Sequence, residues 1–82
     1  MKVSRLKELL KEGHEIEFDY KGKRYGLTWS DVDGEEGVMA FYEFNKDDIA
    51  SKNIDEILSA EYHGLKVADI IEDLDEKEVD IF

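Results

Sequence analysis

Four carboxylates are spaced at i, i+3, i+4 and i+7, as on one side of a helix over about residues 66–75: Asp69, Glu72, Asp73 and Glu76. Aliphatic residues at the same spacing would face a core on the other side: Val67, Ile70, Ile71 and Leu74. Like charges four residues apart destabilise a helix by about 0.2–0.5 kcal/mol per pair, so an acidic stripe has a structural cost. We predict that the stripe binds a basic surface on a protein, as the phosphates of a nucleic acid would. The alternative is a solvated face that only keeps the protein soluble.

Residue types that could carry catalysis do not form a recognisable site. His14 and His63 have no partner at HxxxH or HxxE spacing, and the serines lie outside a nucleophile-elbow motif. The glycines form neither the dinucleotide-binding nor the phosphate-loop pattern. A chain this short also has little room for a concave pocket. We therefore expect no catalytic residue and no cofactor, and we predict that the protein is not an enzyme.

Residues 31–34, with the sequence DVDG, match part of a calcium-binding loop. When Gly34 is aligned with the required glycine, Trp29 falls at the first ligand position and Ala40 at the last. Neither side chain can bind calcium, so an EF-hand is excluded and no metal site is predicted. A polar turn between two strands is the better interpretation of this segment.

The composition limits the protein class. A chain of 82 residues forms one small domain, residues 1–82, and its net charge of −11 disfavours direct binding to nucleic acid or to an anionic membrane. Residues 1–30 carry seven basic and five acidic groups, so the acidity belongs to residues 31–82. The absence of cysteine excludes disulfides and thiolate chemistry. No apolar run approaches the roughly 20 residues of a membrane span, and we expect a cytoplasmic protein.

Two further helix signals precede the acidic stripe. Leucines recur at helical spacing in residues 3–12, where Ser4 is the predicted N-cap and Gly13 would end the helix. Asn53 and Glu56 have the spacing of a capping box, which opens a short helix. Together with the stripe, these signals predict one N-terminal helix and two C-terminal helices.

A β-hairpin is predicted on either side of Lys21-Gly22. Apolar and polar residues alternate over residues 15–20 and 23–29, which is the period of a strand. A two-residue turn fixes the register of the hairpin. Three cross-strand pairs follow from it: Ile16 with Leu27, Phe18 with Tyr25, and Asp19 with Arg24.

A third strand is predicted at residues 38–44, after an acidic loop. Residues 45–52 are polar and are predicted to form a loop, with a helical turn at residues 47–50. Val79 and Ile81 alternate with acidic residues, as in a short C-terminal strand. The predicted fold class is α+β: an N-terminal helix, a three-stranded antiparallel meander, and two C-terminal helices on one sheet face.

The sheet offers a second candidate surface. If the helices cover the face with Phe18 and Tyr25, the other face presents four charged residues: Glu15, Glu17, Asp19 and Arg24. The third strand adds one of two apolar pairs beside these charges: Met39 with Phe41, or Tyr42 with Phe44. An aromatic patch rimmed by carboxylates is typical of a binding site, so Glu15, Glu17 and either Phe41 or Tyr42 are predicted partner contacts. The alternative is that the C-terminal tail covers this face, through Val79, Ile81 or Phe82.

Several segments carry a resemblance: KELLKEGHEIEFDYKGKRYGLTW, GVMAFYEFNKDD, IDEIL, HGLKVADII and EVDIF. Together they resemble small acidic proteins of Gram-positive bacteria and their phages, over most of the chain. This resemblance implies a fold and no activity. In size, charge and element order, the chain is also similar in type to phage-encoded anti-CRISPR and anti-restriction inhibitors that mimic nucleic acid.

We predict a small acidic interaction protein of the phage-inhibitor type. Its partner would be a protein with a basic surface, such as a nucleic-acid-binding enzyme, and salt would weaken the complex. The alternative is a structural or accessory domain whose acidity serves solubility alone. We expect a monomer or a weak homodimer, with no direct contact to nucleic acid or membrane.

Overall fold

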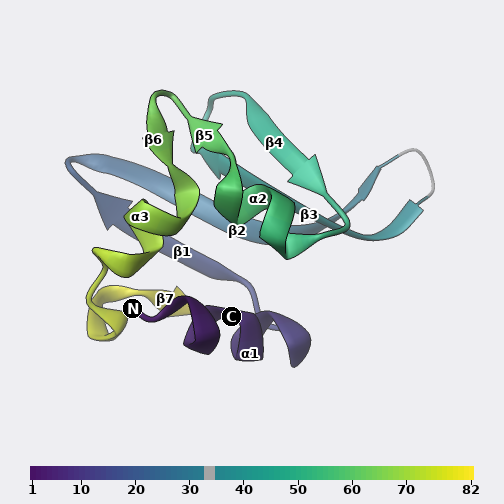
Figure 1. The fold of residues 1–82 in the computed structure, drawn as a ribbon, viewed down its shortest axis with the longest axis horizontal. Coiled ribbons are helices and arrows are strands. Elements are labelled where there is room, and N and C mark those ends of the chain that lie inside the picture. Colours follow the sequence, from purple (N-terminus) through teal and green to yellow (C-terminus); the bar gives the residue numbers. More distant parts are fainter. Residues whose placement is uncertain (33–34) are drawn as a thin grey trace.

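In the described residues, 1–32 and 35–82, three helices pack on one face of a five-stranded antiparallel sheet in the computed structural model (Figure 1). The predicted α+β class is therefore confirmed. The helices and a 3₁₀ turn are α1 Val3–Lys11, α2 Ile54–Ser59, α3 Val67–Glu72 and η1 Glu76–Glu78. The strands are β1 Ile16–Tyr20, β2 Lys23–Val32, β3 Glu35–Glu43, β4 Asp48–Ser51, β5 Glu61–Tyr62, β6 Leu65–Lys66 and β7 Asp80–Ile81. No helix in this part of the chain is long and apolar enough to cross a membrane.

The predicted meander forms only the centre of the sheet, whose strand order is β4-β3-β2-β1-β7. The prediction of a loop and helical turn at residues 45–52 is wrong, because β4 pairs with β3 there. An edge strand this short needs only one apolar side chain toward the core, and Ile49 supplies it opposite Phe41. The predicted C-terminal strand is confirmed as β7, in which Ile81 pairs with Ile16.

The β1–β2 hairpin has the predicted register. Lys21 and Gly22 have φ values of 50° and 79°, the left-handed conformations that a type I′ turn requires. All three predicted pairs form: Ile16 with Leu27, Phe18 with Tyr25, and Asp19 with Arg24. Odd and even positions of each strand therefore face opposite sides of the sheet, and only one side meets the helices.

Aromatic rings form the centre of the core between the sheet and the helices. Tyr25 stacks on Phe18 and on Phe41, with ring centroids 5.6 and 5.7 Å apart. The ring of Tyr62 meets Phe41 edge-on at 5.3 Å. Aromatic pairs of this kind contribute about 0.5–1.5 kcal/mol each beyond their buried area. Leucines of α1 and aliphatic residues of α2 and α3 enclose this cluster.

The helix starts depart from the predicted caps. Helix α1 begins at Val3 after Lys2, so the prediction of Ser4 as its N-cap is wrong. Helix α2 has the predicted Asn53 cap, whose Oδ1 accepts from the Asp55 amide at 2.9 Å. Glu56 reaches this cap indirectly, because Ser51 Oγ donates to its carboxylate at 2.8 Å and accepts from the Asn53 amide at 3.0 Å.

The predicted acidic helix over residues 66–75 is too long at its carboxyl end, since α3 ends at Glu72. The side chains of two aspartates beyond the helix end accept hydrogen bonds. Asp73 accepts a hydrogen bond from the Tyr20 hydroxyl at 3.0 Å, and Asp75 caps η1 by accepting from the Lys77 amide at 3.0 Å. Short carboxylates favour such caps and turns over helix interiors, which explains the early end.

The small β5–β6 hairpin fastens the helical layer to the sheet through Tyr62. Its buried hydroxyl accepts a hydrogen bond from the Glu43 amide at 2.9 Å and donates to the Asp47 carbonyl. The turn after Tyr62 uses left-handed conformations at His63 and Gly64, which brings β6 back beside β5. Burial raises the pKa of Tyr62, so the hydroxyl keeps its proton for this contact.

Replacing Tyr62 by Phe should lower the free energy of unfolding by about 1–3 kcal/mol, because two partly buried backbone groups lose their partner. Urea denaturation measures this change. The matched control is Tyr20→Phe, which removes an exposed hydrogen bond to Asp73 and should cost less than about 1 kcal/mol. Equal losses in the two variants would contradict the fastening role of Tyr62.

Candidate interaction surface

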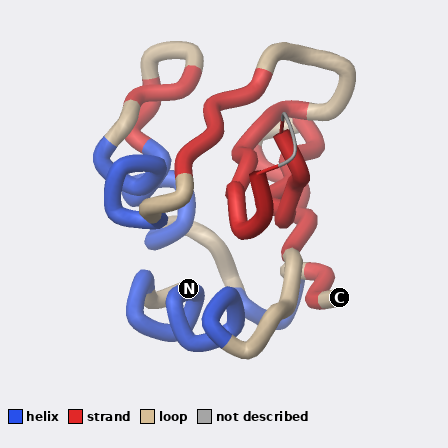
Figure 2. The backbone as a smooth tube through the Cα atoms, turned by 90° about the vertical axis from the view of Figure 1, so that its right-hand side faces the viewer, coloured by secondary structure: helices blue, strands red, loops and turns tan. Residues whose placement is uncertain are grey.

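Figure 2 shows the helices to the left of and below the strands, with no helix of the described residues on the right-hand side of the sheet. We call this side the open face. Its charged and aromatic residues are Glu15, Glu17, Asp19, Arg24, Tyr42, Phe44, Asp48, Asp80 and Phe82. Five opposed residues form one row across it, from β7 to β4: Asp80, Glu17, Gly26, Tyr42 and Asp48.

Two aromatic residues of the open face, Tyr42 and Phe44, lie in contact with each other. Their rings stack with centroids 5.8 Å apart, and Phe44 is 37% exposed. Phe41 points to the other side and is 0% exposed, in contact with the core rings. The prediction that Phe41 contacts a partner is therefore wrong, because the register of β3 turns it toward the helices. Tyr42 remains as the predicted aromatic contact.

Arg24 lies among three carboxylates of the open face. Its guanidinium forms ion pairs with Glu17 at 3.3 Å, with Asp19 at 3.4 Å, and with Asp80. The hydrogen bond to Asp80 is the main cause that raises the pKa of Arg24 above its ordinary value. The same guanidinium lies 5.9 Å from the centre of the Phe44 ring, within cation–π range. One cation thus joins the acidic and aromatic parts, and the carboxylates remain in excess.

Glu15 extends the acidic part toward the end of β2. Its Oε2 accepts a hydrogen bond from the Trp29 amide at 2.9 Å, which holds this carboxylate against the strand. Its backbone bonds to Phe82 in both directions, so the tail continues the sheet beside β1. Phe82 is 62% exposed and Val79 is buried in the core. The tail forms an edge strand instead of covering this face: Val79 and Ile81 lie on the helical side, and Phe82 lies at the margin of the open face beside Glu15.

The predicted acidic stripe does not form one helical face. Asp69 and Glu72 are exposed on α3, whereas Asp73 lies beyond the helix end. Asp73 accepts a hydrogen bond from the Tyr20 hydroxyl, which raises the pKa of Tyr20. Glu76 forms an ion pair with Arg5 at 3.4 Å. Two of the four carboxylates are thus bound to their own chain.

Two contributors to the open face are absent from the predicted site. Asp48 lies on β4, which the sequence analysis takes as a loop, and Asp80 joins the face only because β7 pairs with β1. Asp19 and Arg24 are predicted on this face, and the structure places them opposite each other there. The alternation of Asp48 with Ile49 is a strand signal in the sequence. A segment of four residues is too short for this alternation alone to assign a strand.

Gly26 determines how closely Tyr42 lies on the sheet. The two residues are opposite each other on β2 and β3. A Cβ atom on Gly26 would be 2.8 Å from the Cζ and hydroxyl oxygen of Tyr42. The missing side chain therefore lets the tyrosine ring lie across the neighbouring strand, where it stacks on Phe44.

Gly26→Ala should stabilise the protein only when Tyr42 is also replaced by Ala. In that background alanine gains about 0.5–1 kcal/mol over glycine in a strand, whereas in the natural chain its Cβ displaces the ring. Urea denaturation of the natural chain, the two single variants and the double variant measures the effect of Gly26→Ala on the free energy of unfolding in each background. The same change in free energy of unfolding in both backgrounds would contradict the ring placement.

The two histidines contact carboxylates and backbone. His63 Nε2 lies 2.9 Å from Asp47 Oδ1, and its ring stacks on Tyr62 at 4.1 Å. His14 Nδ1 lies 3.0 Å from the Phe82 carbonyl oxygen. No cluster of metal-binding side chains occurs among the described residues. The partial calcium-loop motif includes residues 33–34 and lies outside them.

His63→Gln should raise the pKa of Asp47, because the hydrogen bond from His63 is the main cause that lowers it. A lowered carboxyl pKa stabilises the fold above the ordinary aspartate pKa, and this contribution is lost as the pH falls through the lowered value. Carboxyl NMR titration measures the shift. His14→Gln is the matched control and should leave Asp47 unchanged; an unchanged Asp47 in His63→Gln would contradict the pairing.

Comparisons with protein-family models, curated proteins and solved structures give no match to this chain. The resemblance to small acidic proteins of Gram-positive bacteria and their phages, and in type to phage inhibitors, stays a prediction. The functional conclusion depends on the geometry of the open face.

Proposed function

We propose that this chain is a non-enzymatic interaction protein whose open face binds a basic surface on a protein partner. The observation that carries this proposal is the row of opposed residues in which Tyr42 lies between acidic strands, next to Phe44. A face with no helix over it supplies both parts of a binding site, an apolar centre and a charged rim.

The charge of the open face specifies the partner chemistry. Five carboxylates lie on it against one guanidinium, that of Arg24. A lysine- or arginine-rich surface would be attracted at long range, and its arginines could use the carboxylates that Arg24 leaves partly exposed. Asp19 and Asp80 have exposed side-chain fractions of 76% and 55%, so both can accept further hydrogen bonds.

The aromatic pair would supply the apolar anchor. Tyr42 and Phe44 already stack, so little conformational entropy is lost when a partner covers them. Tyrosine and phenylalanine are enriched in interface centres. The exposed carboxylates of α3, Asp69 and Glu72, lie on the helical layer and would add long-range attraction only.

A nucleic-acid-binding enzyme is the partner class that this proposal favours. Its basic groove would meet the open face in place of phosphates, so the chain would act as an inhibitor that competes with nucleic acid. The accessory-domain alternative has no such requirement, since it needs neither an acidic rim nor competition.

The test compares two charge reversals of equal size. Asp19→Lys with Asp48→Lys changes the open face, and Asp69→Lys with Glu72→Lys changes α3. Immobilised chains are incubated with nuclease-treated lysate at low salt, and the Kd of the recovered partner is then measured. The open-face variant should bind about tenfold or more weakly, whereas the α3 variant should change the Kd by about threefold or less.

Tyr42→Ala with Phe44→Ala should also weaken binding about tenfold, because the anchor is lost. High salt should weaken the natural complex, and added nucleic acid should displace the chain from the partner. Equal effects of the two charge reversals would contradict the proposal, since they would reflect total charge alone. Binding that is unaffected by salt would favour the accessory-domain alternative.

A further inference from the structure

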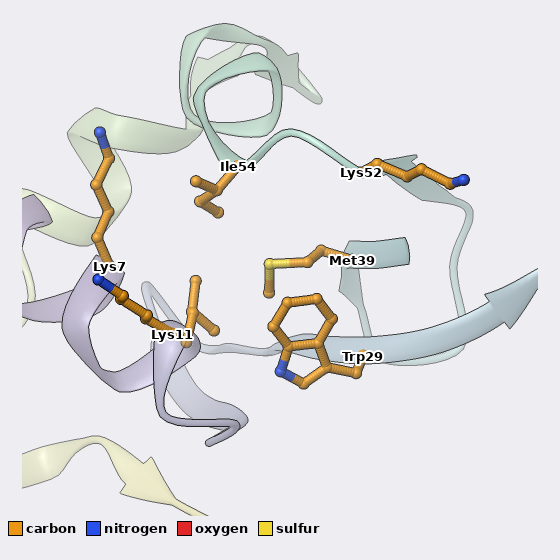
Figure 3. A pocket seen from close by; sticks show the side chains of 7 residues that line it. Lys7, Lys11, Trp29, Met39, Lys52 and Ile54 are labelled. Atoms are coloured by element: carbon orange, nitrogen blue, oxygen red, sulfur yellow. The ribbon is translucent and has the colours of Figure 1, made fainter. Parts of the chain in front are cut away.

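A hollow of about 160 Å³ opens on the helix side of the sheet, away from the open face (Figure 3). Its apolar lining comes from α1, β2, β3 and the start of α2: Leu10, Trp29, Met39 and Ile54. Figure 3 shows Trp29, Met39 and Ile54 directed toward one another around this space. The indole, a thioether and a branched aliphatic chain thus form its walls.

The hollow exists because the central strands are longer than the helices that cover them. Strand β2 has 10 residues and α1 has 9. A strand rises about 3.3 Å per residue and a helix about 1.5 Å, so the strands extend beyond the helical layer. Trp29 lies where this cover ends and is 39% exposed, while Met39 opposite it is 2% exposed.

The rim of the hollow is basic, although the chain has 22 acidic and 11 basic residues. None of its described lining residues carries a carboxylate, and three are lysines: Lys7, Lys11 and Lys52. Their aliphatic stems extend the apolar wall, and Figure 3 shows their ammonium groups at the outside. Lys7 pairs with Asp55 at 2.6 Å, and Lys11 lies one turn further along α1 at the same rim.

We propose that this hollow binds a small aromatic carboxylate. The ring would lie between Trp29 and the side chains of Met39 and Ile54, in aromatic and sulfur–aromatic contact. The carboxylate would lie toward α1, where the flexible Lys11 side chain can turn to meet it. An apolar cavity of about 150 Å³ accepts a single benzene ring, which matches one-ring ligands to this space.

This site is independent of the proposed function, because its residues face the helical side of the sheet and the open face plays no part in it. The lysines specify an anion, and the apolar walls specify a ring, so a free inorganic anion or a neutral ring should each bind more weakly than a ligand with both parts.

The test titrates the full chain with 3-phenylpropionate and with its neutral analogue 3-phenylpropanamide. Trp29 is the only tryptophan, so its fluorescence reports occupancy. The methyl NMR signal of Met39, one of two methionines, gives a second readout. The carboxylate should bind about fivefold more tightly than the amide, the size expected of one partly exposed ion pair.

Lys11→Gln should remove the difference between the two ligands, and Ile54→Ala should weaken both alike. Lys21→Gln, at the β1–β2 turn, is the matched control with the same change of charge and should preserve the difference. Equal affinities for acid and amide in the natural chain, or the same effect of Lys11→Gln and Lys21→Gln, would overturn the proposal. Unchanged Trp29 fluorescence and Met39 shift at saturating ligand would overturn it too.

Discussion

The register of the β1–β2 hairpin is the constraint on which the other features depend. Lys21 and Gly22 adopt the left-handed conformations of a two-residue turn, and this turn places Phe18 opposite Tyr25. A slip of one residue would exchange the two sides of a strand and expose its apolar set. Strand β3 pairs with β2 so that Phe41 is opposite Leu27, and Phe41 therefore enters the core while Tyr42 remains outside.

The two sides of the sheet therefore have different chemistry. The helical side is filled by rings and aliphatic chains. Trp29 is accessible on this side because the strands extend beyond the helices there. The open face combines Gly26 with carboxylates and two stacked rings. A single residue determines the position of the Tyr42 ring, because the absence of a Cβ atom on Gly26 makes room for it. Charge and shape on this face, rather than total acidity, support the proposed binding function.

Strong periodicity made the central strands and α1 predictable, since many apolar residues repeat there. The edge strands were harder to predict. Only Ile49 of β4 packs against the core, and β4 is held mainly by its pairing with β3. The acidic helix was overestimated for a related reason: helical spacing continues through Asp73 and Glu76, but Tyr20 and Arg5 bind these carboxylates from other elements. Contacts between distant segments carry no local signal. The site was accordingly predicted in part, with Glu15, Glu17 and Tyr42 on the open face.

The central claim is that Phe41 and Phe18 are buried on the helical side of the sheet, whereas Tyr42 and Phe44 are accessible on the other side. Relaxation of ring protons by an uncharged, soluble gadolinium chelate measures this directly. The ring of Phe44 should relax strongly and that of half-buried Tyr42 to an intermediate degree, while those of Phe41 and Phe18, with 0% and 1% exposure, should be protected. Equal protection of Phe44 and Phe41 would contradict the account, because the open face would then be covered.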